Sequence, residues 1–252
     1  MSADAARQEL FRLDKVAAVL ESLEETIIYR LLDRAQFAVN PGIYRVVDEP
    51  MPGFRDQSFL QVRQRMQEEM DALFGRFMVP EERPFSTGLP SPRRTTPKSD
   101  NPFPTMDFGT VSQTPAILDS YLQLVQRICP PGDDGHYGSS VETDVAVLQA
   151  LARRIHYGAL YVAESKFLAE PERYGALIRA RDSRAILEAL TRSEVEARIL
   201  VRVREKLDFV QQRVNTAIRR VVDADLVMDY YRDHVIPLTK AGEVAYLLGR
   251  LS

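Results

Sequence analysis

The sequence predicts an all-α fold, a bundle of long helices. Apolar residues recur every three or four positions along most of the chain, which is the period of a helix with one buried side. The first helical segments end at proline or glycine, and no run alternates apolar and polar residues long enough to predict a strand. With 252 residues, 45% of them hydrophobic, the chain is large enough to bury a substantial core. We expect residues 1–252 to form one domain.

The first two helices are predicted at about residues 5–38 and 57–77. The first carries leucine, isoleucine and valine at helical spacing and ends at Asn40, which proline and glycine follow. The second carries phenylalanine and methionine at the same spacing and ends before Pro80. Residues 79–113 are rich in proline and polar residues, so we expect an extended surface segment within the domain.

Later helices are predicted at about residues 114–128, 140–169, 171–180, 183–190, 193–222 and 224–251. Ser183 and Ser193 stand at the start of two of them, where serine is favoured as an N-cap residue. Pro237 interrupts the last one because proline lacks the amide hydrogen of a regular helix. We find no internal repeat, so the chain is expected to form one bundle.

Composition excludes several classes of function. The net charge is −3 and the basic residues are scattered, so no nucleic-acid surface is predicted. The apolar runs are too short for a membrane span or a signal peptide, so we expect a cytoplasmic protein. Cys129 is the one cysteine, and the three histidines lack ligand spacing, so neither a disulfide nor a metal site is expected. We interpret His156 as a structural histidine.

Residues 138–167, GSSVETDVAVLQALARRIHYGALYVAESKF, resemble the signature helix of the eukaryotic-type chorismate mutases. Residues 23–38, 74–85 and 235–251 resemble three further segments of the same family, in the same order. The resemblance implies a helical homodimer that converts chorismate to prephenate by a Claisen rearrangement. It implies no cofactor, and it places the reaction in phenylalanine and tyrosine biosynthesis.

This reaction requires particular side chains. Chorismate has two carboxylates, so a pocket that holds it in its reactive shape needs cations, and arginine binds a carboxylate bidentately. Breaking the ether bond builds negative charge on the ether oxygen. A lysine and a protonated acid aimed at that oxygen stabilise the transition state more than the ground state.

The resemblance assigns these roles to residues of this sequence. Arg154 matches the arginine that binds a substrate carboxylate, and Lys166 matches the lysine that donates to the ether oxygen. Glu196 matches a glutamate near the substrate hydroxyl. Glu243 matches the glutamate that acts at the ether oxygen when protonated, with Thr239 beside it. The last two are four residues apart, so they share a helix face.

Two positions depart from the family pattern. The first helix of the family carries a second arginine for substrate, and this sequence has Ala17 there. Four residues before Glu196 the family has an asparagine, and this sequence has Arg192. Arg192 and Glu196 would share a face of a regular helix. We therefore expect Arg192 in the pocket, as a relocated cation.

The spacing between Arg154 and Lys166 also departs from the family. It is twelve residues here and eleven in the family, where about 100° per residue brings both side chains to one face within about 20°. In a regular helix the extra residue would turn Lys166 about 120° away from Arg154. A π-bulge absorbs one residue, and such bulges occur often at functional sites. We predict one near residues 158–161.

The expected effector site is altered as well. In resembling enzymes an aromatic amino acid binds between subunits, against paired arginines and a Gly-Ser turn. Here the arginine pair reads Gly75 and Arg76, while Gly138 and Ser139 remain. Glu142 replaces an expected threonine and adds negative charge where the effector carboxylate would bind. We expect weak or absent control by tyrosine and tryptophan.

Three functions are consistent with the sequence. The first is a chorismate mutase with an altered pocket. The second is an enzyme acting on a chorismate relative, such as isochorismate or an aminodeoxychorismate, which Arg192 favours. The third is a non-catalytic dimeric homologue, which Ala17 and the inserted residue favour.

Overall fold

In the computed structural model the described residues are 3–46, 54–93, 101–104 and 107–250. Within these ranges the chain forms helices and turns, and its extended pairing is limited to an isolated bridge between Val46 and Ser58. The prediction of an all-α fold is confirmed. None of the helices in these ranges is both long and apolar enough to cross a membrane.

The α-helices are α1 (Ala3–Leu10), α2 (Leu13–Arg34), α3 (Phe59–Leu73), α4 (Thr114–Ile128), α5 (Tyr137–Tyr157), α6 (Ala163–Ala169), α7 (Pro171–Ala180), α8 (Ser183–Leu190), α9 (Ser193–Gln211), α10 (Ala224–Tyr230) and α11 (Ile236–Gly249). In the described ranges three short 3₁₀ helices accompany them, η1 (Pro41–Tyr44), η2 (Arg76–Met78) and η3 (Phe108–Val111). Two π-helical turns, η4 (Gly158–Val162) and η5 (Tyr231–Val235), lie inside longer helices.

Several predicted boundaries were wrong. The first predicted helix is divided at Arg12, whose backbone is extended, into α1 and α2. The helix expected to reach residue 222 ends at Gln211. The N-cap position of α8 is Asp182, whose side chain accepts the N–H of Ala185, and so Ser183 is the first helical residue. Arg192 holds the same position before α9, without a side-chain cap bond.

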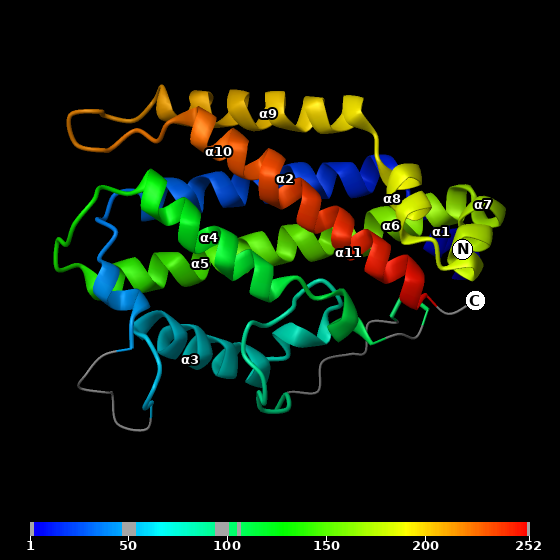
Figure 1. The fold of residues 1–252 in the computed structure, drawn as a ribbon, viewed down its shortest axis with the longest axis horizontal. Helices are drawn as coiled ribbons and strands as arrows, with labels where there is room; N and C mark the ends of the chain where they lie inside the picture. Colours follow the sequence, from blue (N-terminus) through cyan, green and yellow to red (C-terminus); the bar gives the residue numbers. More distant parts are fainter. Residues whose placement is uncertain (1–2, 47–53, 94–100, 105–106, 251–252) are drawn as a thin grey trace.

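The two longest helices, α2 and α5, pack against each other along the middle of the molecule (Figure 1). On one edge α9 lies beside α2, and on the opposite edge α3 packs against α5. The last helices, α10 and α11, cross the bundle to the end where α7, α8 and both chain termini lie. One core cluster fills the space among α2, α4, α5, α9 and α10, and a second lies around η4, α8 and α11.

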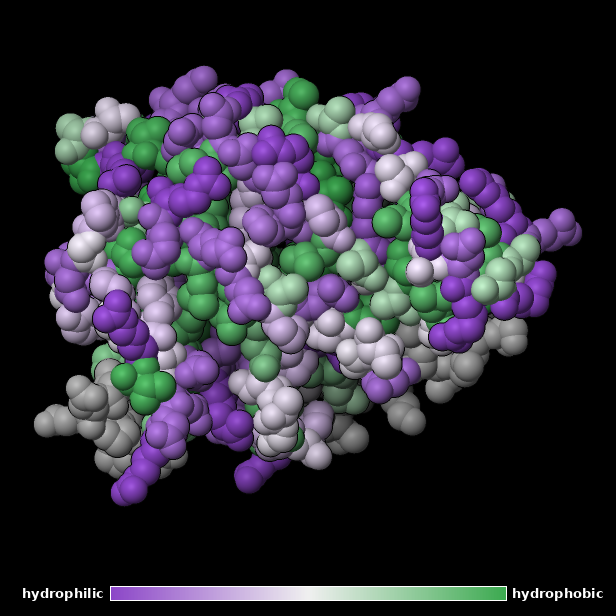
Figure 2. Space-filling model, in the orientation of Figure 1, coloured by the Kyte–Doolittle hydropathy of each residue, from purple (hydrophilic) through white to green (hydrophobic). Residues whose placement is uncertain are grey.

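The apolar stripes are turned inward, as the sequence predicts. Along α2, Ile27, Ile28 and Leu31 are at most 1% exposed. On the face shown in Figure 2, hydrophobic residues lie in groups between hydrophilic ones. The proline-rich segment contributes Phe103 to the second core cluster, where its ring contacts Tyr161 and Tyr246.

A buried glutamate connects the two ends of the chain. Glu164 on α6 is fully buried and accepts hydrogen bonds from Arg7 at 2.6 Å and from the hydroxyl of Tyr246 at 2.7 Å. It also accepts one from Arg250, at 2.8 Å. One carboxylate thus joins α1, α6 and the end of α11.

The π turn η4 confirms the predicted bulge, since it occupies residues 158–162 within the continuous helix formed by α5, η4 and α6. A second π turn, η5, was not predicted. It comes just before α11, in which Pro237 lies near the N-terminus. The ring of a proline clashes with the carbonyl four residues earlier, here that of Asp233, and the wider turn places this carbonyl differently.

Two glycines allow η4 and α11 to approach closely. A Cβ atom built on Gly242 would lie 2.6 Å from the Cβ of Ala159, and one built on Gly158 would lie 2.6 Å from a methyl group of Thr239. Real Cβ atoms do not approach so closely, so the backbones would have to separate. The crossing is therefore specific for glycine.

We expect Gly242→Ala to lower the free energy of unfolding by about 1–3 kcal/mol, because the added methyl group overpacks the crossing with Ala159. The higher helix propensity of alanine offsets about 1 kcal/mol of this loss. Gly138→Ala is the control, since a Cβ there meets no atom within 4 Å. Urea unfolding at neutral pH measures both. A Gly242→Ala variant as stable as the unaltered chain would contradict this packing.

Candidate active site

Arg154 lies near the end of α5 with its side chain buried, since the residue is only 2% exposed. Its Nη1 donates to Oγ1 of Thr239 on α11, at 3.0 Å, and this hydroxyl donates to the carbonyl of Val235 at 2.7 Å. Its Nη2 lies 3.9 Å from Oε1 of Glu24 on α2. The cation is thus held between α2 and α11.

Lys166 reaches the same region from α6. Its Nζ donates to the carbonyl of Leu190 at 2.7 Å and to Oε2 of Glu243 at 3.4 Å. Glu243 is 5% exposed, and burial raises the pKa of its carboxyl group, although the charges of Lys166 and Arg154 act in the opposite direction. An ammonium group therefore adjoins a carboxyl group that keeps its proton to a higher pH than usual.

The π turn makes this arrangement possible. Arg154 and Lys166 are twelve residues apart, and they contact Thr239 and Glu243, which lie one turn apart on α11. In a regular helix the side chain of Lys166 would point about 120° away from that of Arg154. The extra residue is absorbed in η4, so both cations face α11.

Glu196 joins this group through Lys240, which was not predicted from the sequence. Its Oε1 lies 2.5 Å from Nζ of Lys240 on α11, and both side chains are partly exposed. Lys240 also lowers the pKa of the Glu243 carboxyl group, although less than Lys166 and Arg154 do. Glu196 and Lys240 therefore form the outer rim of the site.

Arg192 is not placed with these residues. Its side chain is exposed, and no side-chain hydrogen bond or ion pair in the described part of the chain connects it to them, although its carbonyl accepts the backbone N–H of Glu196 at 3.1 Å. Its charge helps to lower the pKa of Glu170, after the larger effect of Arg173. The expected shared face with Glu196 was wrong because Arg192 precedes α9, with φ −134° and ψ 86°, and helical spacing does not apply there.

Ala17 lies on α2, half-buried, seven residues before Glu24 and so on the same side of that helix. The structure places Leu20 between them, with a methyl group 3.6 Å from a Cβ built on Gly158. The α2 surface facing the site is thus apolar near position 17 and acidic at Glu24.

Glu24 is a second residue that the sequence argument missed. It is fully buried, and Arg202 on α9 donates to both of its oxygens, each at 2.8 Å. The sequence does contain a signal for this residue, because Glu24 stands inside the apolar stripe that contains Ile27 and Ile28. A glutamate is rarely buried without a partner, so this position indicates a paired, functional or structural carboxylate.

His156 is structural, as interpreted from the sequence. It is fully buried, and its Nε2 accepts the backbone N–H of Gln113 at 2.9 Å. Burial lowers the pKa of its imidazole to about 4, so the ring is neutral at neutral pH.

The residues expected to bind an effector lie far apart within one chain. Arg76 is held by Asp71 at 2.8 Å, by Glu82 at 3.0 Å and by Gln149 at 2.7 Å. Gly138 and Ser139 are in the first turn of α5, and Gln149 is eleven residues from Gly138, about 16 Å along the helix.

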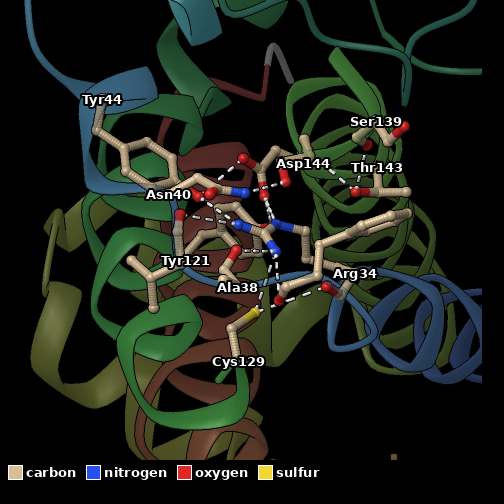
Figure 3. A network of polar contacts seen from close by, with 12 residues as sticks. Arg34, Ala38, Asn40, Tyr44, Tyr121, Cys129, Ser139, Thr143 and Asp144 are labelled. Atoms are coloured by element: carbon tan, nitrogen blue, oxygen red, sulfur yellow. Dashed lines mark hydrogen bonds and ion pairs between the residues drawn. The ribbon is translucent and has the colours of Figure 1, made fainter. Parts of the chain in front are cut away.

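Beneath the first turns of α5, Arg34 is completely buried and bound to Asp144 (Figure 3). Its Nε donates to that carboxylate at 2.5 Å, and the hydroxyls of Tyr44 and Tyr121 donate to it at 2.8 and 2.5 Å. The guanidinium group also donates to the backbone carbonyls of Phe37, Ala38 and Val39. This network fixes the end of α2 to α5, away from the site.

No protein-family model matches the chain. Known proteins do, and one is the chorismate mutase of Schizosaccharomyces pombe, which is 39% identical over 249 residues that cover 96% of this chain and 98% of that protein. The chain belongs to the chorismate mutase family. The Aro7p chorismate mutase of Candida albicans in complex with L-Trp superposes with a TM-score of 0.85 at 28% identity, covering 96% of this chain and 92% of that one.

A further structure, AtCM1 with phenylalanine bound in its allosteric site, has a TM-score of 0.83 and 36% identity, and covers 96% of this chain and 97% of that one. The family names support the first of the three functions considered above and give no support to the other two. Family and fold therefore agree with the resemblance found in the sequence.

Proposed function

We propose that this protein is an enzyme that rearranges chorismate to prephenate, in the biosynthesis of aromatic amino acids. The observation that carries the proposal is the buried contact of Lys166 with Glu243, 3.4 Å apart, beside the buried cation of Arg154. The names of the relatives support it independently.

The reaction breaks a C–O bond and forms a C–C bond within one molecule, so the protein need supply no nucleophile. Arg154 binds one substrate carboxylate. Lys166 and protonated Glu243 donate to the ether oxygen as its negative charge develops, in a buried site where such contacts are strong. Glu196, held by Lys240, accepts from the substrate hydroxyl.

The second carboxylate lacks the arginine that Ala17 replaces. We propose Arg192 for it. Arg192 is exposed without substrate, so it has to turn inward when the dianion binds. Its position two residues after Leu190, whose carbonyl contacts Lys166, supports this assignment.

The test is to incubate the purified chain with chorismate and to measure chorismate loss and prephenate formation. Prephenate formation that Lys166→Met abolishes supports the proposal. Consumption of isochorismate with chorismate left unchanged would support the second function, and turnover of neither substrate would reject both enzymatic functions.

Glu243→Gln is expected to remove a pH dependence. Burial raises the pKa of Glu243, and the protonated form is the donor, so kcat/KM should fall about tenfold per unit as the pH rises above that pKa. Glutamine keeps an N–H donor at every pH, so the variant should have a flat profile on the alkaline side. Profiles from about pH 5 to 9 measure this.

Glu196→Gln is the control for that profile, since Glu196 lies at the rim beside Lys240. It should lower the activity but keep the alkaline fall. If Glu243→Gln kept the same fall, another group would have to be the donor.

We also propose a homodimer and a cytoplasmic location. Arg76 contacts Gln149, which lies about 16 Å along α5 from Gly138, so one effector can contact Arg76 and Gly138 together only if they come from different copies. Asp71 and Glu82 already bind the Arg76 guanidinium and compete for it with an effector carboxylate. This supports weak control of the activity by tyrosine and tryptophan. Sedimentation analysis tests the dimer, and assays with added tyrosine and tryptophan test the control.

A further inference from the structure

Two buried donors in the candidate site have no hydrogen-bond partner in the described part of the chain. They are Nε of Arg154 and the hydroxyl of Tyr231. Oε1 of Glu196, at the rim, has no hydrogen-bond partner either, but it is an acceptor and lies 2.5 Å from Nζ of Lys240. Tyr231 is fully buried and is the first residue of the π turn η5. A buried hydroxyl or guanidinium N–H without an acceptor is destabilising, so each such group calls for an explanation.

The acceptors near these two groups are already engaged. Glu24 uses both of its oxygens for Arg202, at 2.8 Å each. Oγ1 of Thr239 accepts from Nη1 of Arg154 and donates to Val235. Around Arg154 and Tyr231 the site thus has two donors without an acceptor.

The two groups belong to the same part of the site. Burial raises the pKa of the Tyr231 hydroxyl, and among the charges that act on it the largest effect is that of Arg154, which opposes the rise. Glu24 and Arg202 follow among the other charges. The segment η5 packs against both α9 and α11, which carry Arg202 and Thr239. Thr239, to which Arg154 donates, itself donates to the carbonyl of Val235 in η5. Tyr231 therefore lies near the Arg154 guanidinium, on the side of η5.

We propose that the Tyr231 hydroxyl and Nε of Arg154 together bind one carboxylate of the substrate. The inference rests on the proposed function and names a substrate contact for it. A carboxylate oxygen accepts from a neutral O–H and a charged N–H at once, and it would satisfy both unpartnered donors. A neutral donor is also consistent with Ala17, which leaves α2 with one arginine fewer than the family pattern.

The neighbouring tyrosine provides a matched control. Tyr230 is buried too, but its hydroxyl has a partner, since it lies 3.1 Å from the hydroxyl of Ser120. Phenylalanine at either position keeps the ring and removes one oxygen. The two substitutions should therefore have opposite effects on stability and on binding.

For Tyr231→Phe we expect a chain at least as stable as the unaltered one, because the hydroxyl that is removed has no partner. We expect KM for chorismate, and Kd for prephenate as a probe, to rise about tenfold or more, because a hydrogen bond to a charged group is lost. The kcat should change less than about threefold, since the carboxylate contact exists in both ground and transition states. Tyr230→Phe should lower the melting temperature and leave KM and Kd unchanged.

The measurements are steady-state kinetics, calorimetric titration with prephenate, and thermal unfolding of both variants. KM and Kd of Tyr231→Phe within about twofold of the unaltered chain would overturn the proposal, as would an equal rise in Tyr230→Phe. Failure of the proposed function would look different, because the unaltered chain would then form no prephenate. The titration tests the contact without turnover.

Discussion

Arg154→Gln is expected to lower kcat/KM for chorismate about a thousandfold. The guanidinium group is 2% exposed and lies between Thr239 and Glu24, so a substrate carboxylate that binds it is almost free of competing water. Each charge-assisted hydrogen bond in such a place is worth about 1.5–3 kcal/mol, and removal of one preorganised donor lowers rates about 10²–10³-fold. Steady-state assays measure the loss.

The preceding residue provides the control. Arg153 is exposed and lies 3.3 Å from Glu82, on another side of α5. Arg153→Gln should leave kcat/KM within about twofold, since exposed ion pairs contribute about 0–1 kcal/mol. A loss of less than about tenfold in a folded Arg154→Gln variant would remove Arg154 from the substrate site.

Asp144→Asn is expected to lower the free energy of unfolding by about 3–5 kcal/mol, because it leaves the completely buried Arg34 without a counter-charge. The substitution also weakens two hydrogen bonds, since the hydroxyls of Tyr44 and Tyr121 both donate to the Asp144 carboxylate. Urea unfolding at neutral pH measures the loss. Arg184→Met, which removes an exposed pair with Glu188, should change stability by less than about 1 kcal/mol.

A double variant keeps this test informative when the single one does not fold. Arg34→Met with Asp144→Leu removes both charges, and replacing a buried ion pair by apolar residues is often neutral or stabilising. The double variant should therefore be more stable than Asp144→Asn. A single variant that loses less than about 1 kcal/mol would show that the pair is not needed to keep α2 on α5.

Most of the helices were predictable because they have a strong apolar period and several are followed by proline or glycine. The prediction for α4, residues 114–128, matches both ends. The break at Arg12 was not predictable from the period, because the apolar stripe continues across it, from Leu10 to Leu13. The long prediction for α9 failed because Val214, Ile218 and Val221 keep the helical spacing beyond Gln211, where the helix has already ended.

The site was predictable where it depends on spacing inside helices. The twelve residues between Arg154 and Lys166 led to the π turn η4, since only a wider turn keeps both cations on one side. No residue spacing in the sequence indicates the second π turn, so Tyr231 was not predicted as a site residue. The outward direction of the Arg192 side chain was not predictable, because its position just outside α9 depends on one pair of backbone angles, which the residue pattern does not contain.

Glu164 has a consequence for how the molecule opens. Because Arg7, Tyr246 and Arg250 all donate to this one carboxylate, loosening α1 or the end of α11 removes partners from an anion that stays in the interior. Fraying at one end is therefore opposed by the contacts of the other. The two extremities of the polypeptide should exchange their amide hydrogens as a single cooperative unit, which includes the helix that carries Lys166.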